Sequence, residues 1–485
     1  MRGLSFRVTG TALLLYASSA AAAAPGGQTV TLCHIPPGRP QAAVTLHLPA
    51  AAAAAHLGHG DRPGPCRAPD DACDPGRRGF SCDDAAYTLG RLILESENAE
   101  EIALLALPDR GSAPPLGDLT SVPPPTVAMG RCIEQAFAQE PEVGFSYALA
   151  RDAVLQVSGA GGFARAPWES EASGATMTPD TRMTIASVSK PVTAVAIMRL
   201  LEEHPVGLDD PFYPLVSAKF NGLSTSGDLT LYTIPGPGVG AVTIRHLLTH
   251  TSGLKPGLGC GQLPLLLGLG AIHPPGTVHD YENSNYCLLR EVIEQVSGVD
   301  YIAYVQQKVL QPMGILTMSC ERDQTNPALY YNTIGDPGFL WGDYVSSCSA
   351  YGWYASARHL TQFLVGVRSH AAISAASTDQ MFGECFDKPG PGEYCLGWTK
   401  ANGAVGTYLS HSGDWIKNGC YNEATGNNEC PKGFNGTITR FPLGIDATLF
   451  VNTRGGTGPN PPLKSEATIL RECYEQVFQA VNPGP

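Results

Sequence analysis

A serine and a lysine three residues apart, Ser187 and Lys190, open an apolar run that ends at Glu202. We expect a helix here, because Pro191 is tolerated only in a first turn and neither Gly nor Pro interrupts the rest. Residues three apart share one helical face, so the amine would lie beside the hydroxyl. A hydroxyl needs a base to become a nucleophile, and free N–H groups at a helix start can bind an oxyanion. The pair predicts nucleophilic catalysis, although an ordinary helix start followed by a solvated lysine gives the same pattern.

A phenol and a carboxamide, Tyr281 and Asn283, stand together further along the chain, before the helical run at residues 287–298. Two residues apart in an extended turn, they would point to the same side. A phenolate near cations can act as a base, and a carboxamide can bind both a lysine and a substrate amide. The alternative for Tyr281 is an ordinary half-buried aromatic residue.

A glycine near the C-terminus could bring substrate close to a strand. Residues 406–414 and 447–453 read as strands, and Gly413 lies in the first of them. Without a side chain, Gly413 lets a substrate backbone approach closely. The N–H of Asp414 could then complete an oxyanion hole together with the N–H of Ser187.

Taken in order, S-x-x-K, Y-x-N and His411-Ser412-Gly413 resemble the serine β-lactamase and penicillin-binding protein superfamily, in its class C-like branch. The surrounding segments SVSKPVTA, VGLDDP, TIRHLLTHTSGL, YENSNY, LGW and SHSG agree with this resemblance, which runs from about Thr126 to the end. It implies an α+β fold, in which an antiparallel β-sheet flanked by helices carries an inserted, mainly α-helical region. The site would lie in the cleft between the two regions.

The resemblance also implies roles for individual residues. Ser187 would form an acyl-enzyme, Lys190 and Tyr281 would share the acid and base work, and Asn283 would position the lysine and the substrate. Further substrate-binding residues would come from the strand: His411, Ser412, Gly413 and Asp414. His246 and His250, with Thr251-Ser252-Gly253, look like a second nucleophile cluster, but the resemblance makes this stretch structural.

Two departures from the family pattern concern the substrate. Where relatives usually carry K-T-G, this chain has His411-Ser412-Gly413. A histidine is mostly neutral at pH 7 and reaches less far than lysine, so binding of a substrate carboxylate should be weaker. Arg454 could supply a substitute cation. Glu282 stands between Tyr281 and Asn283, where a small residue is commoner, and would alter the field at the tyrosine or point to solvent.

These features predict a secreted serine hydrolase that acts on an ester or an amide, as esterases and D-amino-acid peptidases do. The alternatives are a β-lactamase or D-Ala-D-Ala carboxypeptidase, and a catalytically inactive binding or sensor protein. The chain contains no G-x-S-x-G and no H-E-x-x-H, which argues against an α/β-hydrolase and a zinc protease. We expect a small-molecule or peptide substrate, with cell-wall fragments among the candidates, and no cofactor.

The N-terminus reads as an export signal, residues 1–24, with Arg2 and Arg7 before an apolar run that ends in small residues. We therefore expect a secreted or periplasmic bacterial protein with no membrane-spanning segment after signal removal. The net charge of −13 and the lack of a basic block argue against nucleic acid as a partner. Fourteen cysteines in an exported chain indicate disulfides. The close pairs are Cys73–Cys82, Cys385–Cys395 and Cys420–Cys430.

The predicted organisation continues with a Cys/His-rich module at residues 28–66, a linker at 67–125 with a helix over 85–107, and the hydrolase domain at 126–485. The module resembles a CH-x-PPG…HL-x-HGD…C unit of exported bacterial proteins. Its thiols and imidazoles are Cys33, His34, His47, His56, His59 and Cys66. Such groups bind zinc or copper, but a Cys33–Cys66 disulfide fits equally and the spacing matches no standard zinc finger, so we assign no metal site. In the hydrolase domain we expect a helix at 128–138 and a strand pair at 145–150 and 154–159.

Overall fold

The computed structural model describes residues 29–34, 44–49, 62–63, 124–139, 142–169, 174–221, 235–323, 325, 327–332, 334–335, 337–417, 421–422, 427–428, 432–453 and 465–481. The chain divides into two compact units, Met1–Arg110 and Gly111–Pro485. In the first unit, the described backbone forms a three-stranded antiparallel sheet of order β2-β1-β3. Its strands are β1 at Thr29–His34, β2 at Val44–Pro49 and β3 at Arg62–Pro63.

Several sequence predictions lie outside the described part of the chain and stay predictions. They are the export signal at 1–24, the ligand candidates of the Cys/His-rich module, the helix at 85–107, the pairs Cys73–Cys82 and Cys420–Cys430, and the possible cation Arg454.

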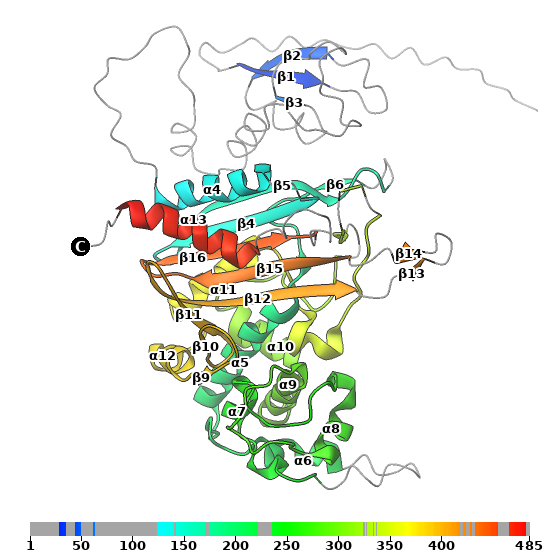
Figure 1. The fold of residues 1–485 in the computed structure, drawn as a ribbon, viewed down its shortest axis with the longest axis vertical. Helices are drawn as coiled ribbons and strands as arrows, with labels where there is room; N and C mark the ends of the chain where they lie inside the picture. Colours follow the sequence, from blue (N-terminus) through cyan, green and yellow to red (C-terminus); the bar gives the residue numbers. More distant parts are fainter. Residues whose placement is uncertain are drawn as a thin grey trace, which may run out of the picture. The chain divides into compact units, whose positions relative to one another are not determined.

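A nine-stranded sheet organises the second unit, with the order β6-β5-β4-β16-β15-β12-β11-β10-β9 (Figure 1). Neighbouring strands are antiparallel throughout. The strands are β4 Gly144–Arg151, β5 Val154–Arg165, β6 Ala175–Thr176, β9 Phe386–Asp387, β10 Glu393–Tyr394, β11 Thr399–Gly403, β12 Gly406–Lys417, β15 Lys432–Arg440 and β16 Ile445–Val451. Two short pairs complete the strands: β7 Met183–Thr184 with β8 Tyr354–Ala355, and β13 Tyr421–Asn422 with β14 Asn427–Asn428.

Two helices from opposite ends of the second unit cover one face of this sheet (Figure 1). They are α4, Pro125–Gln139, and α13, Glu466–Val481, which pack on each other and on the central strands. The Cys132–Cys473 disulfide joins them. Their apolar side chains form a separate core with those of β4 and β16, for example Ile133, Leu449 and Leu470. Burial of this apolar surface is what holds the terminal helices to the sheet.

The opposite face carries the larger core and the helical region that was predicted. Helix α11, Ala357–Arg368, packs against β16 and β4, and α5, Ser189–Glu203, lies in the middle of the core. The other helices are α6 Phe212–Asn221, α7 Ile244–Leu248, α8 Leu263–Leu269, α9 Asn283–Ser297, α10 Tyr301–Val305 and α12 Ala375–Gly383. Short helical turns lie at Ala186–Val188, Val239–Ala241, Cys260–Gln262, Gln306–Leu310, Val345–Ser347 and Cys348–Gly352.

The α+β fold expected from the resemblance is confirmed: a large antiparallel sheet lies between helices, with a mainly helical region between α5 and α11. Strand β16 has helices over both faces, and it is buried at all 7 positions, which explains its nearly continuous apolar sequence. The predicted Cys385–Cys395 disulfide is present. Among the described residues, no helix is both long and apolar enough to cross a bilayer.

Candidate active site

Ser187 lies in the middle of the helical turn Ala186–Val188, which leads directly into α5. Pro191 falls in the first turn of α5, as predicted, where its missing N–H is not needed. The preceding residue, Ala186, has φ of 41°, a left-handed value that is rare for a residue with a side chain. Backbone strain of this kind concentrates at functional sites, so the local conformation supports Ser187 as the nucleophile.

Lys190 is fully buried and its Nζ makes three short polar contacts. They lead to Ser187 Oγ at 3.1 Å, to Asn283 Oδ1 at 2.7 Å and to the carbonyl oxygen of Ala350 at 3.0 Å. Burial lowers the pKa of Lys190 well below its usual value, and the charge of Glu282 only partly opposes this. The side chain of Lys190 can therefore exist as a neutral amine at a lower pH than an exposed lysine.

The contacts of Lys190 allow a neutral amine to act as a base. A carbonyl and an amide oxygen can only accept, so Ala350 and Asn283 take the two N–H hydrogens. A neutral Lys190 has its lone pair left for the third contact, Ser187 Oγ, whereas a protonated Lys190 donates to it. This geometry is the one a general base requires, with the base in hydrogen-bond reach of the proton it abstracts.

Tyr281 completes the group around the nucleophile. Its hydroxyl faces the side chain of Ser187. The residue as a whole is 40% exposed, but its hydroxyl end is enclosed, and this burial raises the pKa of Tyr281 above its usual value, with a smaller contribution from the nearby charge of Asp414. Lys190 Nζ lies 4.7 Å from the centre of the phenol ring. At a pH where Lys190 is already neutral, the phenol of Tyr281 is therefore still protonated.

Asn283 differs in one detail from the sequence prediction. We expected an extended turn from Tyr281 to Asn283, but only Tyr281 and Glu282 precede the helix, and Asn283 is the first residue of α9. The helix begins there because its apolar face starts at once, with Tyr286 and Leu289 buried. One turn into α9, Cys287 is joined to Cys260 by a disulfide, which ties the start of the helix to the neighbouring loop.

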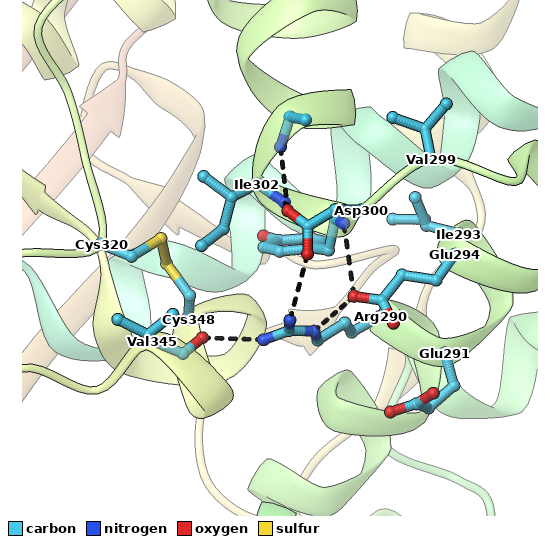
Figure 2. A network of polar contacts seen from close by, with 12 residues as sticks. Arg290, Glu291, Ile293, Glu294, Val299, Asp300, Ile302, Cys320, Val345 and Cys348 are labelled. Carbon is cyan, nitrogen blue, oxygen red and sulfur yellow. Dashed lines mark hydrogen bonds and ion pairs between the residues drawn. A yellow bond between two sulfur atoms is a disulfide. The ribbon is translucent and has the colours of Figure 1, made fainter.

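Ala350 contributes through its backbone, and its segment is held from α9. Figure 2 shows Arg290 of α9 donating to the carbonyl oxygen of Val345, at 2.7 Å. The same view contains the disulfide of Cys348 with Cys320. These contacts lie within five residues of Ala350 and fix the turns on which its carbonyl is presented to Lys190.

Strand β12 forms the other wall. His411 and Gly413 alternate onto the same face of the strand and are buried, while Ser412 and Asp414 are exposed. A Cβ on Gly413 would overlap the carbonyl of Ile185 and lie 3.1 Å from the nitrogen of Ser187, so only glycine fits. In the described part of the sheet, residues 411–417 pair with β15 alone, and their other edge is open beside the Ser187 turn.

His411 is only 4% exposed and both its ring nitrogens are occupied. Nδ1 donates to the carbonyl oxygen of Ser412 at 2.8 Å, and Nε2 accepts from the hydroxyl of Tyr394 at 3.0 Å. Burial, with Lys190 nearby, lowers the pKa of His411 to about 3. The ring is therefore neutral, as the sequence suggested. The hydroxyl of Ser412 lies 3.3 Å from that of Thr437 on β15.

The structure brings Ser187, Lys190, Tyr281, Asn283 and Gly413 together, with His411 behind them. Sequence reasoning missed the carbonyl of Ala350 and the hydroxyl of Tyr394. The first is a backbone group, which leaves no trace in residue type, and Tyr394 lies two residues before the LGW segment without a chemical signal of its own.

A model of the Beta-lactamase family matches residues 131–461, a range that contains all of these residues. The chain belongs to this family. A penicillin-binding protein of Bacillus subtilis (strain 168) is 26% identical over 278 residues, covering 48% of this chain and 55% of that protein. The chain thus spans about half the length of this curated relative.

Two solved structures share the fold of this β-lactamase family member. The octameric penicillin-binding protein homologue from Pyrococcus abyssi has a TM-score of 0.54 at 22% identity, covering 73% of this chain and 77% of that one. D-amino acid amidase from Ochrobactrum anthropi SV3 has a TM-score of 0.55 at 17% identity, covering 74% of this chain and 98% of that one.

Proposed function

We propose that this chain is a serine hydrolase that forms an acyl-enzyme on Ser187, with Lys190 as the base of the first step. The observation that carries this proposal is the arrangement around the buried Nζ: two of its contacts are groups that can only accept, and the third is the Ser187 hydroxyl, which a neutral amine can deprotonate. A solvated lysine after a helix start, the alternative reading, would not be fully buried.

In the first step, the Ser187 hydroxyl gives its proton to Lys190 Nζ while Oγ attacks the substrate carbonyl carbon. The carbonyl electron pair moves to the oxygen, where the N–H groups of Ser187 and Asp414 would stabilise the negative charge. Collapse of this intermediate breaks the bond to the leaving group, which takes a proton from the phenol of Tyr281. Lys190 then passes the proton that it took from Ser187 to the phenolate. Water releases the acyl group by the reverse sequence.

The substrates we propose are esters or amides without a carboxylate next to the scissile bond. The neutral, fully engaged ring of His411 offers no N–H and no charge to such a carboxylate. Asp414 is exposed beside Tyr281 and would repel it. A charge-assisted hydrogen bond is worth about 1.5–3 kcal/mol, so its loss disfavours penicillins and peptides ending in D-alanine by roughly ten- to a hundredfold. L-phenylalanine amide, with which the Ochrobactrum D-amino acid amidase was solved in complex, lacks this carboxylate.

We also propose that the enzyme is exported. Its N-terminal 24 residues have the composition of an export signal, and four disulfides among the described residues fit an oxidising compartment. An exported hydrolase of this kind would meet small esters, amides or cell-wall fragments outside the cytoplasm.

A fluorophosphonate probe tests the proposal. Such a probe should label the purified protein on Ser187, Ser187→Ala should remove both the label and ester hydrolysis, and Ser297→Ala, at the far end of α9, should keep both. An unlabelled but folded protein would instead be a binding or sensor protein. Nitrocefin hydrolysis faster than hydrolysis of short-chain nitrophenyl esters would favour the β-lactamase alternative.

A further inference from the structure

His250, two residues beyond the end of α7, holds the turn that carries Tyr281 at two points. It is 1% exposed and has φ of 57°, a conformation that few residues with a side chain adopt. Its carbonyl oxygen accepts the N–H of Asp280 at 2.8 Å, and its Nδ1 accepts the N–H of Glu282 at 3.1 Å. One residue thus binds the backbone on both sides of the catalytic phenol.

The side chain of His250 also supports the phenol ring itself. The two ring centres lie 4.2 Å apart and the ring planes are inclined by 33°. Contact over this distance fixes the tilt of Tyr281, whose outer side is exposed. The left-handed backbone of His250 is what turns the ring inward to this position, since it follows α7 at a sharp reversal of the chain.

The tautomer of His250 follows from its neighbours on α9. The hydroxyl of Ser252 donates to Asn285 Oδ1 at 2.7 Å, so the NH₂ group of that amide faces His250 Nδ1, at 3.2 Å. Nδ1 therefore accepts two hydrogens and the ring proton is on Nε2. A doubly protonated ring would set an N–H against two other N–H donors and lose both bonds.

We propose that His250 is a positioning residue for catalysis: as a neutral imidazole accepting through Nδ1, it sets the turn at Tyr281 so that the phenol meets Ser187. This inference rests on the proposed function, because it takes Tyr281 to be the acid of the reaction. Burial, more than any neighbouring charge, lowers the pKa of His250 well below its usual value. Lys190, His279 and His411 are its electrostatic neighbours, and Tyr281, Tyr286 and Tyr394 pack against it.

Three substitutions separate the features that His250 combines. His250→Asn keeps an acceptor and tolerates positive φ, His250→Gly tolerates positive φ without an acceptor, and His250→Ala has neither. We expect kcat for a nitrophenyl ester to fall about 10- to 100-fold in the Gly and Ala variants, with a small change in KM, and His250→Asn to recover a large part of it. Rates are expressed per fluorophosphonate-titrated site, so that unfolded protein does not count.

A double-mutant cycle with Tyr281→Phe gives a readout that a merely structural role would not move. If His250 acts through the phenol, the His250 variants should lower kcat much less in the Tyr281→Phe background than in the native one. Independent, multiplicative losses would overturn the inference, and so would equal kcat in His250→Gly and His250→Asn. Full activity of Tyr281→Phe or Ser187→Ala would instead overturn the proposed function itself.

Discussion

Replacing Asn283 with aspartate should move the acid limb of the pH profile. The substitution puts a carboxylate of the same shape 2.7 Å from Lys190 Nζ, where an amide oxygen now lies. An opposite charge this close raises a lysine pKa by about 1–3 units, and each unit corresponds to about 1.36 kcal/mol. Lys190 must be neutral to accept the Ser187 proton, so its protonated form would persist to higher pH. We expect the limb in kcat/KM to move up by about 1–3 pH units.

The assay follows kcat/KM for a neutral nitrophenyl ester against pH at constant ionic strength. Below the new limb, each pH unit should cost about tenfold in rate, while the alkaline plateau stays near that of the native enzyme. Asn402→Asp is a matched control, because it adds the same charge at an exposed site on β11, where Asn402 accepts only from Thr407. A limb that stays in place, or moves to lower pH, in Asn283→Asp would refute Lys190 as the base.

Gly413→Ala should lower kcat by about 100-fold, because a Cβ would overlap the Ile185 carbonyl and displace the strand from the Ser187 nitrogen. Stopped-flow acylation would measure this loss, and a rate near the native one would show that β12 need not approach the nucleophile so closely. Removing the disulfide with Cys132→Ser and Cys473→Ser should cost about 2–5 kcal/mol in the free energy of unfolding with little change in kcat. Denaturant unfolding and ester assays would check this, since α4 and α13 lie on the sheet face away from α5.

The order of the main elements, and which residues gather around Ser187, could largely be predicted from the sequence because local patterns encode them. The placement of Lys190 beside Ser187 follows from helical geometry alone. The glycine at position 413 indicates that another backbone comes close to the strand there. The strand pair β4–β5 and the helix α4 were likewise expected and are present.

The rest of the site depends on contacts between segments that lie far apart in the chain. Nothing in the type of Ala350 shows that its carbonyl would meet an amine 160 residues earlier. The bond of Tyr394 on β10 to His411 on β12 and the ring contact of His250 with Tyr281 arise in the same way, from segments that the fold brings together. The periodicity and spacing of residues in the sequence do not predict such tertiary contacts.

The two acceptors of Lys190, Asn283 and the carbonyl of Ala350, both lie a few residues from a disulfide-bonded cysteine in the sequence. Asn283 is four residues from Cys287 and Ala350 is two residues from Cys348. A newly made chain carries thiols at these places, so the segments that present both acceptors lack their covalent ties, and hydrogen bonds such as that of Arg290 to Val345 remain. We therefore expect the proposed activity to depend on oxidation of these cysteines as well as on folding. On the proposed mechanism, Ser187 would be less reactive in a reducing compartment than in an oxidising one.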